Sequence, residues 1–522
     1  MDAAVDIGNR PSVDAPSPSG WELGDLWRVA MLGVIQAVFV ALLWPPFLTN
    51  WDSYLYTYAA FGFEPIPLAL GRWLYPAMLG SVWAVFHRLF SIDPDDAWMV
   101  FSGVSAAAAM VNVVLFYGLS RRWIGPRGAL LASAIVVSSP LVGIYGSAVM
   151  TETFAMTLLL VSLLFVQGHP SLLRTAVAGL MFGAACAIRE PMIFLVPLHL
   201  GLIWRYGRDH SRRFACLGLF ASLAVLAVGL NTLAGYLSDP QWVVRYHEWS
   251  AGMLAERSDT GLVLPRLFLA NLVCYAGYLL TFSPVLPFLM PVLLLRRRCV
   301  SPIWFRPLLL AFGLYSLAQI VNHTLPVNPR FVIPAGVLAT IPIVWSLGRR
   351  WPVLLRWKAT AAVIVAVNLL LLAADWDWVE EFHFYPARAS LATFETLHLA
   401  SEHAVLFPGA LTPVVHYYKE TRDLPWRIVH SGWSFDPQSA REALNFAEKE
   451  GCPVLLVDPW FWRDVSFGPG EHETYQRINY GERSPSPVAN FSLLSPRGDP
   501  PVTTTRTAPP PAAVRPGSIE DD

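Results

Sequence analysis

The stretch VAMLGVIQAVFVALLWPP, Val29–Pro46, is a nearly continuous apolar run closed by two prolines, and the more polar stretch NWDSYLYTYA, residues 50–59, follows it. A helix needs about 20 apolar residues to cross a bilayer, so the run predicts a membrane span that ends near the prolines. Asp52 and the tyrosines at 54, 56 and 58 then lie at the edge of the membrane. An acid and three phenols at that depth are the first candidates for a functional site.

The composition is that of a membrane protein. Of the 522 residues, 54% are hydrophobic and only 14% are charged, whereas a soluble protein carries about 25% charged residues. The net charge of −1 argues against nucleic acid as a partner. The five cysteines form no CxxC pair, so neither a disulfide framework nor a zinc site is indicated. No cofactor is indicated, and although the acids are compatible with a divalent metal, no motif points to one.

Further apolar stretches continue the pattern of the first. Together they predict eleven spans, at residues 28–48, 97–118, 128–147, 150–167, 172–188, 191–205, 214–234, 267–295, 307–325, 331–348 and 359–374. The segment at residues 71–90 is also apolar, but Arg72, His87 and Arg88 bracket it. We therefore expect it to be a helix lying in the membrane interface. The fold class is a polytopic α-helical membrane protein, with its transmembrane domain at residues 28–375.

Basic residues distinguish the two sides of the membrane. Every second predicted loop is basic, and these loops hold Arg121, Arg122, Arg127, Arg174, Arg205, Arg208, Arg212, Arg213, Arg296, Arg297, Arg298, Arg306, Arg349, Arg350, Arg356 and Lys358. The positive-inside rule makes these loops cytoplasmic, which places the loop with Asp52 outside. Lysine occurs only at positions 358, 419 and 449, and such arginine-rich usage favours a GC-rich bacterial genome. We expect a multi-pass protein of a bacterial inner membrane.

The two ends of the chain differ from the span region. Residues 1–27 are a polar leader, which we expect to be cytoplasmic and disordered. Within residues 376–495, three segments are typical of strands, HAVLFPG at 403–409, RIVHSGW at 427–433 and PVLLVDPW at 453–460, and AREALNFAEKEG at 440–451 is typical of an amphipathic helix. They predict a small extracytoplasmic α/β domain. The tail at 496–522 is rich in proline and threonine, so we expect it to be disordered.

Two acids on the predicted outer side are candidates for chemistry. Aromatic neighbours would partly desolvate Asp52, and desolvation raises a carboxyl pKa toward values useful for a general base. Glu152, in a short outer turn, could complete a two-carboxylate site. The alternative for Asp52 is an ordinary solvated loop acid. The alternative for Glu152 is an acid in the first turn of a helix that Thr151 or Thr153 caps.

Four arginines lie on the same predicted side, where the positive-inside rule predicts few. They are Arg72, Arg189, Arg245 and Arg330. Arginine binds phosphate in bidentate fashion, so these cations beside two acids indicate an anionic ligand such as a lipid phosphate. One alternative is that these arginines have no ligand and simply extend their charged groups into the membrane interface, as arginines at the ends of spans often do. Another is that Arg189 pairs with Glu190.

In their order and sidedness these features resemble the GT-C superfamily of polytopic glycosyltransferases, especially the branch of protein O-mannosyltransferases and the lipid A aminoarabinose transferase. The motifs are Asp52 with Tyr54 and Tyr56, then GRWLYP at 71–76, TETF at 151–154, GLMFGAACAIREP at 179–191 and NPRFVIPA at 328–335. One position departs from the pattern, because Ser53 stands where many relatives have a second acid. No role that needs two adjacent acids is therefore expected.

The resemblance implies transfer of a sugar from a polyprenyl-phosphate donor to a hydroxyl of a glycan, lipid or protein acceptor at the outer membrane surface, with inversion. It implies Asp52 as the general base and Glu152 as the acid that orients the acceptor or assists the base. Arg189 and Arg330 correspond to ligands of the carrier's phosphate. The remaining candidates for substrate binding are Arg72, Arg245, Tyr54 and Tyr56.

Two other classes of protein are compatible with many spans. A transporter or lipid flippase usually has ionisable residues within its spans or helices broken near the middle of the membrane, whereas the acids and arginines here lie at predicted span ends. A membrane scaffold for the C-terminal domain, without catalysis, is the third hypothesis.

Overall fold

The computed structural model describes residues 21–48, 51–62, 71–168, 171–206, 210–241, 244, 264–289, 302–322, 328–350, 357–384, 387–388, 391, 404–407, 417–418, 428–430, 454–459, 475–479 and 489–496. The chain divides into two compact units, Met1–Leu391 and Ala392–Asp522. The first unit is helical and the second contains strands.

The helices of the first unit largely follow the apolar stretches. Up to the middle of the unit they are α1 (Leu23–Leu42), α2 (Trp51–Ala60), α4 (Leu74–Phe90), η1 (Pro94–Asp96), α5 (Ala97–Val137), α6 (Pro140–Ser147), α7 (Thr151–Val166), α8 (Leu172–Ile188), η2 (Glu190–Leu195), α9 (Val196–Tyr206) and α10 (His210–Ser238). Beyond it they are α12 (Leu264–Phe282), α13 (Val285–Leu289), α15 (Phe305–Asn322), η3 (Pro329–Val332), α16 (Ile333–Arg350), α17 (Trp357–Ala374), α18 (Trp376–Val379) and the π-helical turn η5 (Glu380–Phe384).

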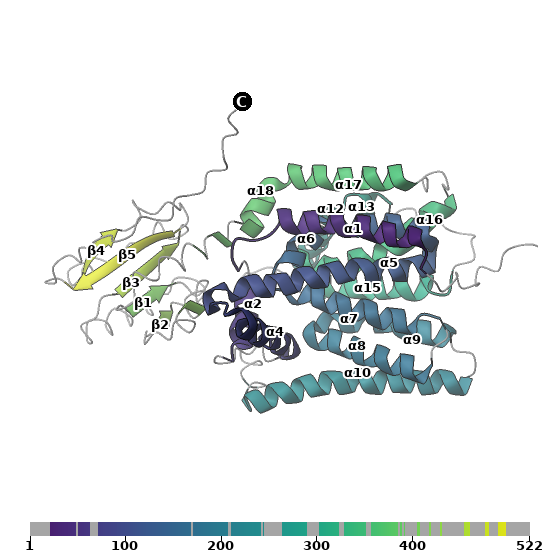
Figure 1. Cartoon of the computed structure of the whole chain (residues 1–522), viewed down its shortest axis with the longest axis horizontal. Helices are drawn as coiled ribbons and strands as arrows, with labels where there is room; N and C mark the ends of the chain where they lie inside the picture. Colours follow the sequence, from purple (N-terminus) through teal and green to yellow (C-terminus); the bar gives the residue numbers. More distant parts are fainter. Residues whose placement is uncertain are drawn as a thin grey trace, which may run out of the picture. The chain divides into compact units, whose positions relative to one another are not determined.

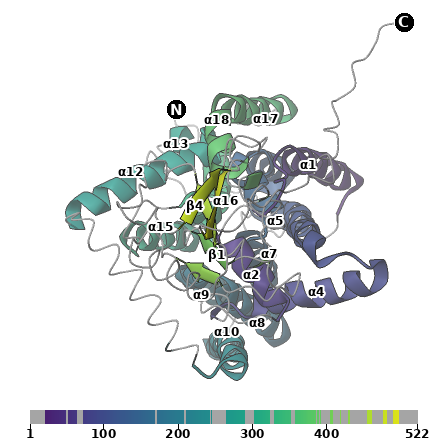
Figure 2. The ribbon, with the colours of Figure 1, turned by 90° about the vertical axis from the view of Figure 1, so that its left-hand side faces the viewer.

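Most of the long helices run side by side as a bundle. Helices α1, α5, α7, α8, α10, α15 and α17 run in nearly the same direction in Figure 1. Helix α4, which covers the predicted interfacial segment, instead lies across this direction, as Figure 2 shows. A helix across the bundle axis is the orientation expected of an interfacial helix.

Within the described part of the chain, four helical segments are long and apolar enough to cross a membrane: Leu23–Leu42, Pro94–Val137, His210–Ser238 and Pro329–Arg349. Helices α6 and α7 together would make a fifth, bent by 105°. Among the described residues four shorter apolar helices accompany them, at Leu172–Ile188, Phe268–Phe282, Phe305–Val321 and Lys358–Ala374. The chain is therefore an integral membrane protein, while the number of eleven spans stays a prediction.

The break predicted between the spans at 97–118 and 128–147 is confirmed. Within α5, two helices meet at a kink at Gly125, which is non-helical with φ 76° and ψ 166° and precedes Pro126. A second break, which was not predicted, falls inside the span at 128–147, where the Ser139 side chain accepts from the amide of Val142 and Pro140 begins α6. A capping serine followed by proline begins a new helix, which the apolar pattern does not register.

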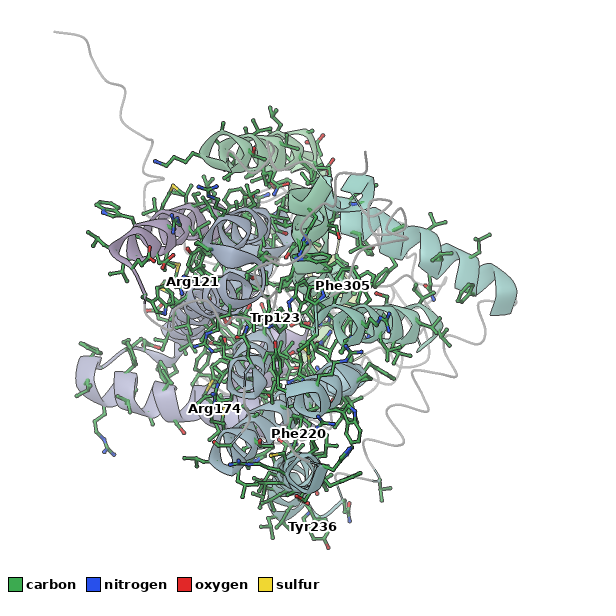
Figure 3. The ribbon with its side chains drawn as sticks, turned by 90° about the vertical axis from the view of Figure 1, so that its right-hand side faces the viewer. Arg121, Trp123, Arg174, Phe220, Tyr236 and Phe305 are labelled. Atoms are coloured by element: carbon green, nitrogen blue, oxygen red, sulfur yellow. The ribbon has the colours of Figure 1, made fainter. Side chains whose placement is uncertain are left out.

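A buried acid joins α1 to α5. The Asp25 carboxylate accepts from the Tyr117 hydroxyl at 2.7 Å and from Arg28 at 2.9 Å, and its second oxygen lies 2.9 Å from Nε of Arg121. Figure 3 shows Arg121 from this end of the bundle, together with Trp123 of α5 and Arg174 of α8. Arginines from separate predicted cytoplasmic loops thus share one end, as the positive-inside assignment requires.

Helices α8 and α10 approach closely at two glycines. A Cβ on Gly179 would lie 2.6 Å from the carbonyl oxygen of Phe220, and one on Gly183 would lie 2.3 Å from that of Ala224. Small residues four apart allow such backbone contact between membrane helices. This packing fixes the end of α8, where Arg189 follows.

The second unit contains a five-stranded sheet in the order β2-β1-β3-β5-β4. Strand β1 (Ala404–Phe407) pairs in parallel with β2 (Ile428–His430) and β3 (Val454–Pro459), and β5 (Ala489–Pro496) is antiparallel to β3 and β4 (Tyr475–Asn479). The three parallel strands coincide with the predicted ones, whereas β4 and β5 were not expected. The predicted amphipathic helix lies outside the described residues, so the α/β assignment and the extracytoplasmic location stay predictions.

Candidate active site

The short helix α2 directs Asp52 and Tyr56 into the same region. Asp52 lies in the first turn of α2, where the helix dipole favours a negative charge, and Tyr56 is one turn further on the same face. Tyr54 faces elsewhere: its hydroxyl donates to the carbonyl of Leu48 at 3.3 Å and its ring packs on Phe47. Tyr54 therefore contacts the chain that leads into α2 rather than the acid.

The Asp52 carboxylate lies between two arginines from distant parts of the sequence. Nη1 of Arg330 donates to Oδ2 of Asp52 at 2.6 Å, and Nη1 of Arg72 lies 4.0 Å from the same oxygen. Arg330 is in the turn η3, and Arg72 lies two residues before the start of α4. The first loop, the interfacial helix and the late NPRF motif thus converge on one carboxylate.

Glu152 and Arg189 form a second, deeper pair. Oε1 of Glu152 is 3.0 Å from Nη2 of Arg189 and 3.6 Å from Nε of Arg330. The guanidinium groups of both arginines lie over the ring of Phe331, at 4.6 and 5.3 Å from its centroid, within the range of cation–π contacts. Arg330 therefore links the two acidic positions.

Arg72 is held by a bidentate pair that the sequence analysis did not identify. Its Nε and Nη2 donate to the carboxylate of Glu190 at 3.0 and 2.9 Å, and its Nη1 donates to the Tyr56 hydroxyl at 2.5 Å. The alternative pairing of Arg189 with Glu190 is wrong, because Arg189 pairs with Glu152 instead. The adjacent basic and acidic residues at 189 and 190 point to different partners, which adjacency in sequence could not reveal.

Two asparagines position the basic residues, and sequence reasoning missed both. Asn231 of α10 accepts from the amide of Leu74 and donates to the carbonyl of Gly71, each at 2.9 Å. It therefore fixes the backbone before and after Arg72. Asn328 caps η3 by accepting from the amide of Arg330 at 3.2 Å and also accepts from the Tyr145 hydroxyl at 3.1 Å. An asparagine before a Pro-Arg turn is a capping signal that could have identified Asn328.

The charge environment lowers the pKa of Asp52 rather than raising it. Burial alone would raise this pKa, but the guanidinium groups of Arg330 and Arg72 outweigh burial and hold it below its ordinary value of 3.8. The expectation of a raised pKa from aromatic neighbours is therefore wrong. Burial, only partly opposed by Arg72, raises the pKa of Tyr56 to about 12, so this phenol stays neutral.

The structural alternative for Asp52 is wrong, and the alternative for Glu152 is confirmed only in part. Asp52 is largely buried and ion-paired, unlike a solvated loop acid. Met150 occupies the N-cap position of α7 and no side chain caps the helix there, so capping by Thr151 or Thr153 is wrong. Glu152 does lie in the first turn of α7, where a helix favours an acid. Arg245 lies outside the described residues.

The carboxylates of the cluster are matched by cations within the protein. Asp52, Glu152 and Glu190 each lie within 3.0 Å of a guanidinium nitrogen. In the part of the chain that the structure describes, no group of three or more His, Cys, Asp or Glu side chains could hold a metal ion. The arrangement suits a ligand with its own negative charge, because arginines can exchange a carboxylate for a phosphate.

Comparisons with known proteins agree with this fold. A family model described as dolichyl-phosphate-mannose-protein mannosyltransferase matches residues 75–230, a range that includes Glu152 and Arg189. The crystal structure of ArnT from Cupriavidus metallidurans in the apo state is similar, with a TM-score of 0.55, 13% identity, and coverage of 91% of this chain and 98% of that chain. The form bound to undecaprenyl phosphate gives a TM-score of 0.54 and 12% identity, with coverage of 91% and 99%.

A second solved protein shares the architecture. The Archaeoglobus fulgidus oligosaccharyltransferase, crystallised with Zn and sulfate, gives a TM-score of 0.50 and 13% identity, with coverage of 91% of this chain and 74% of that chain. No curated protein matches the chain in sequence. At these identities the likeness is one of fold. The family model and the shared fold confirm the resemblance to the GT-C glycosyltransferases.

Proposed function

We propose that this protein is an inverting membrane glycosyltransferase that moves a sugar from a polyprenyl-phosphate donor to an acceptor hydroxyl on the extracytoplasmic side. The observation that supports this most directly is the Asp52 carboxylate held between the guanidinium groups of Arg330 and Arg72. A base beside two phosphate-binding groups is what such a transfer needs. The similar ArnT structure contains undecaprenyl phosphate, which supports a polyprenyl-phosphate donor.

The reaction follows from the positions of these groups. Asp52 accepts the proton of the acceptor hydroxyl as the oxygen forms a bond to the anomeric carbon of the sugar. The bond between that carbon and the phosphate oxygen breaks, and its electron pair stays on the departing polyprenyl phosphate. Attack from the face opposite the phosphate inverts the anomeric carbon. Arg72 and Arg330 neutralise the charge that develops on the leaving group.

Arg330 has two roles in this scheme. Arg330 neutralises Asp52 at 2.6 Å, and a donor phosphate would compete with the carboxylate for the same guanidinium. Transfer of Arg330 to the phosphate removes the nearest cation from Asp52, so burial then raises the Asp52 pKa toward that of an effective base. Donor binding thereby prepares the carboxylate for the acceptor.

The distribution of arginines is the basis for placing the site on the extracytoplasmic side of the membrane. Arg189 of the cluster follows the last residue of α8, whereas Arg174 lies near the start of that helix. The cluster is therefore at the opposite end of α8 from Arg174, which Figure 3 shows together with Arg121. Because the positive-inside rule assigns that basic end to the cytoplasm, the cluster faces outward. A carrier that presents its sugar at the outer surface would meet Asp52 at the depth of the lipid phosphates.

The experiment is a transfer assay with the purified full chain in liposomes, a panel of radiolabelled polyprenyl-phosphate sugars, and a membrane extract that supplies acceptors. We expect a covalent glycoside and release of polyprenyl phosphate. Asp52→Asn should lower the rate by at least about 100-fold, the usual contribution of a general base, while the protein stays folded. Ser53→Ala is the matched control, since Ser53 donates only to the sulfur of Met150 in this region.

Two results would contradict the proposal. Full activity of Asp52→Asn would remove Asp52 as the base. Movement of the labelled lipid across the bilayer with no covalent product would instead identify a flippase.

A further inference from the structure

The charged residues of the candidate site form a cluster whose members differ in how deeply their side chains are buried. Glu190, Arg330, Asp52 and Arg72 form its outer part, with side-chain exposures of 47%, 17%, 13% and 10%. Glu152 and Arg189 form its inner part, and both are 1% exposed. A phosphate that enters from the membrane surface on a lipid meets the outer arginines first. The inner pair lies where the group beyond the phosphate would reach.

The inner pair also has hydrogen-bonding capacity that the described residues leave unused. Although Nη2 of Arg189 is 3.0 Å from Oε1 of Glu152, the two do not have the geometry of a hydrogen bond. Within the described part of the chain, both Nη atoms of Arg189, Oε1 of Glu152 and Nε of Arg330 have no hydrogen-bond partner. Buried polar groups are almost always satisfied by protein, water or ligand. Three donors and one acceptor at one place therefore indicate a site for a polar group.

We infer that Glu152 and Arg189 form the subsite for the donor's sugar, and that this subsite binds the hydroxyl groups of an uncharged sugar. A sugar hydroxyl can donate to the carboxylate and accept from the guanidinium at once, which matches the unused atoms of both residues. This inference rests on the proposed function. It assigns the phosphate to Arg72 and Arg330 alone, although the resemblance to the family also suggests Arg189 for that role.

Charge balance specifies the uncharged sugar. Glu152 and Arg189 neutralise each other across 3.0 Å in a site that is almost fully buried. An amino sugar or a sugar acid would add a charge with no opposite partner there, and burying an unpaired charge is unfavourable. Hydroxyl groups add none. The pair would therefore discriminate against charged analogues of the same ring.

The test compares two double variants, each of which removes one cation and one acid: Asp52→Asn/Arg330→Gln and Glu152→Gln/Arg189→Gln. The probe is decaprenyl phosphate, which has no sugar, and its binding to the purified full chain in nanodiscs is measured by native mass spectrometry. We expect the first variant to lose at least about tenfold in affinity, the effect of one charge-assisted contact. The second should bind the lipid within about threefold of wild type, yet show a donor KM at least about tenfold higher for a neutral sugar.

The results separate the inference from the function on which it rests. If the wild-type protein does not bind decaprenyl phosphate, the proposed function and the inference both fail. If Glu152→Gln/Arg189→Gln weakens decaprenyl phosphate as much as the outer variant does, Arg189 is a phosphate ligand and only the inference is overturned. Thermal unfolding of both variants verifies that each is folded.

A second measurement tests the uncharged sugar directly. Polyprenyl-phosphate mannose and glucose are compared with the same carrier bearing glucosamine, by kcat/KM in the transfer assay. We expect at least about a tenfold preference for a neutral hexose over glucosamine, and loss of that preference in Glu152→Gln/Arg189→Gln. An equal or higher kcat/KM for glucosamine would overturn the assignment.

Discussion

Nη1 of Arg330 lies 2.6 Å from Oδ2 of Asp52, although the two residues are 278 positions apart in the sequence. The contact joins the first turn of α2 to the turn that precedes α16. In the proposed reaction this arginine neutralises the base before the donor binds, and then supplies a cation to the donor's phosphate. The two acids and the arginines are therefore best understood as one exchangeable network.

The first prediction concerns pH. The folded-state pKa of Asp52 is below its ordinary value of 3.8, so its carboxylate is lost only as the pH falls through that lower value, and the stabilising ion pair is fully present above 3.8. The pH profile of kcat/KM reports the pKa values of the free enzyme. The fall in kcat/KM on the acid side should therefore occur below pH 3.8. The acid limb of the kcat profile should lie at higher pH, because the donor phosphate withdraws Arg330 from Asp52.

Initial rates between about pH 3 and pH 8 give both limbs. Arg330→Gln removes the closest cation, so burial dominates and the acid limb of kcat/KM should move to higher pH. Identical limbs for kcat and kcat/KM in the wild type, with no change in Arg330→Gln, would show that Arg330 does not control the base.

The second prediction concerns the shape of the Arg72 side chain. All three nitrogens of its planar fork donate hydrogen bonds, Nε and Nη2 to Glu190 and Nη1 to Tyr56, and a lysine retains the charge but not this geometry. Arg72→Lys should therefore raise the donor KM by about tenfold and change kcat much less. Arg88→Lys, at an exposed position near the end of α4, the helix that follows Arg72, is the control. Wild-type kinetics in Arg72→Lys would mean that only the charge at position 72 matters.

The sequence predicted which residues meet at the site better than it predicted how they pair. Apolar runs locate the helix ends, and Asp52, Glu152, Arg189 and Arg330 all lie at or beside such ends. When helices cross the same layer, residues at their corresponding ends converge. The pairing of Arg189 with Glu152 depends on the rotation of α7 and α8 about their axes, which no local pattern specifies.

The orientation of Tyr54 and the strand β4 could not be predicted from the sequence either. Tyr54 and Tyr56 are two positions apart, so on a helix they point in different directions, and only Tyr56 contacts Arg72. The strand β4, with the sequence YQRIN, lacks the apolar run that identified β1 to β3. Pairing with its neighbour β5, rather than its own composition, makes it a strand.

The third prediction tests the close contact between α8 and α10. Gly183→Ala would place a methyl group 2.3 Å from the carbonyl oxygen of Ala224 and 2.7 Å from its Cα, so the helices must separate. We expect a loss of about 2 kcal/mol in the free energy of unfolding, as for other overpacked contacts, seen as a lower apparent Tm. Gly218→Ala on α10 is the matched control, since a Cβ there meets nothing within 4 Å, and it should be neutral or slightly stabilising. Equal Tm values for the two variants would contradict the contact.

The last prediction concerns Asn231, which bridges the amide of Leu74 and the carbonyl of Gly71. Asn231→Ala removes both hydrogen bonds, at about 1 kcal/mol each, and releases the turn that carries Arg72. Both the Tm and the donor affinity should fall. Thr232→Ala, which removes only a bond to Val228 within the same helix, should leave the donor affinity unchanged. If Asn231 acts through Arg72, the double variant Asn231→Ala/Arg72→Lys should bind donor no more weakly than Arg72→Lys alone, because coupled positions are not additive. Additive losses would place the effect of Asn231 elsewhere in the fold.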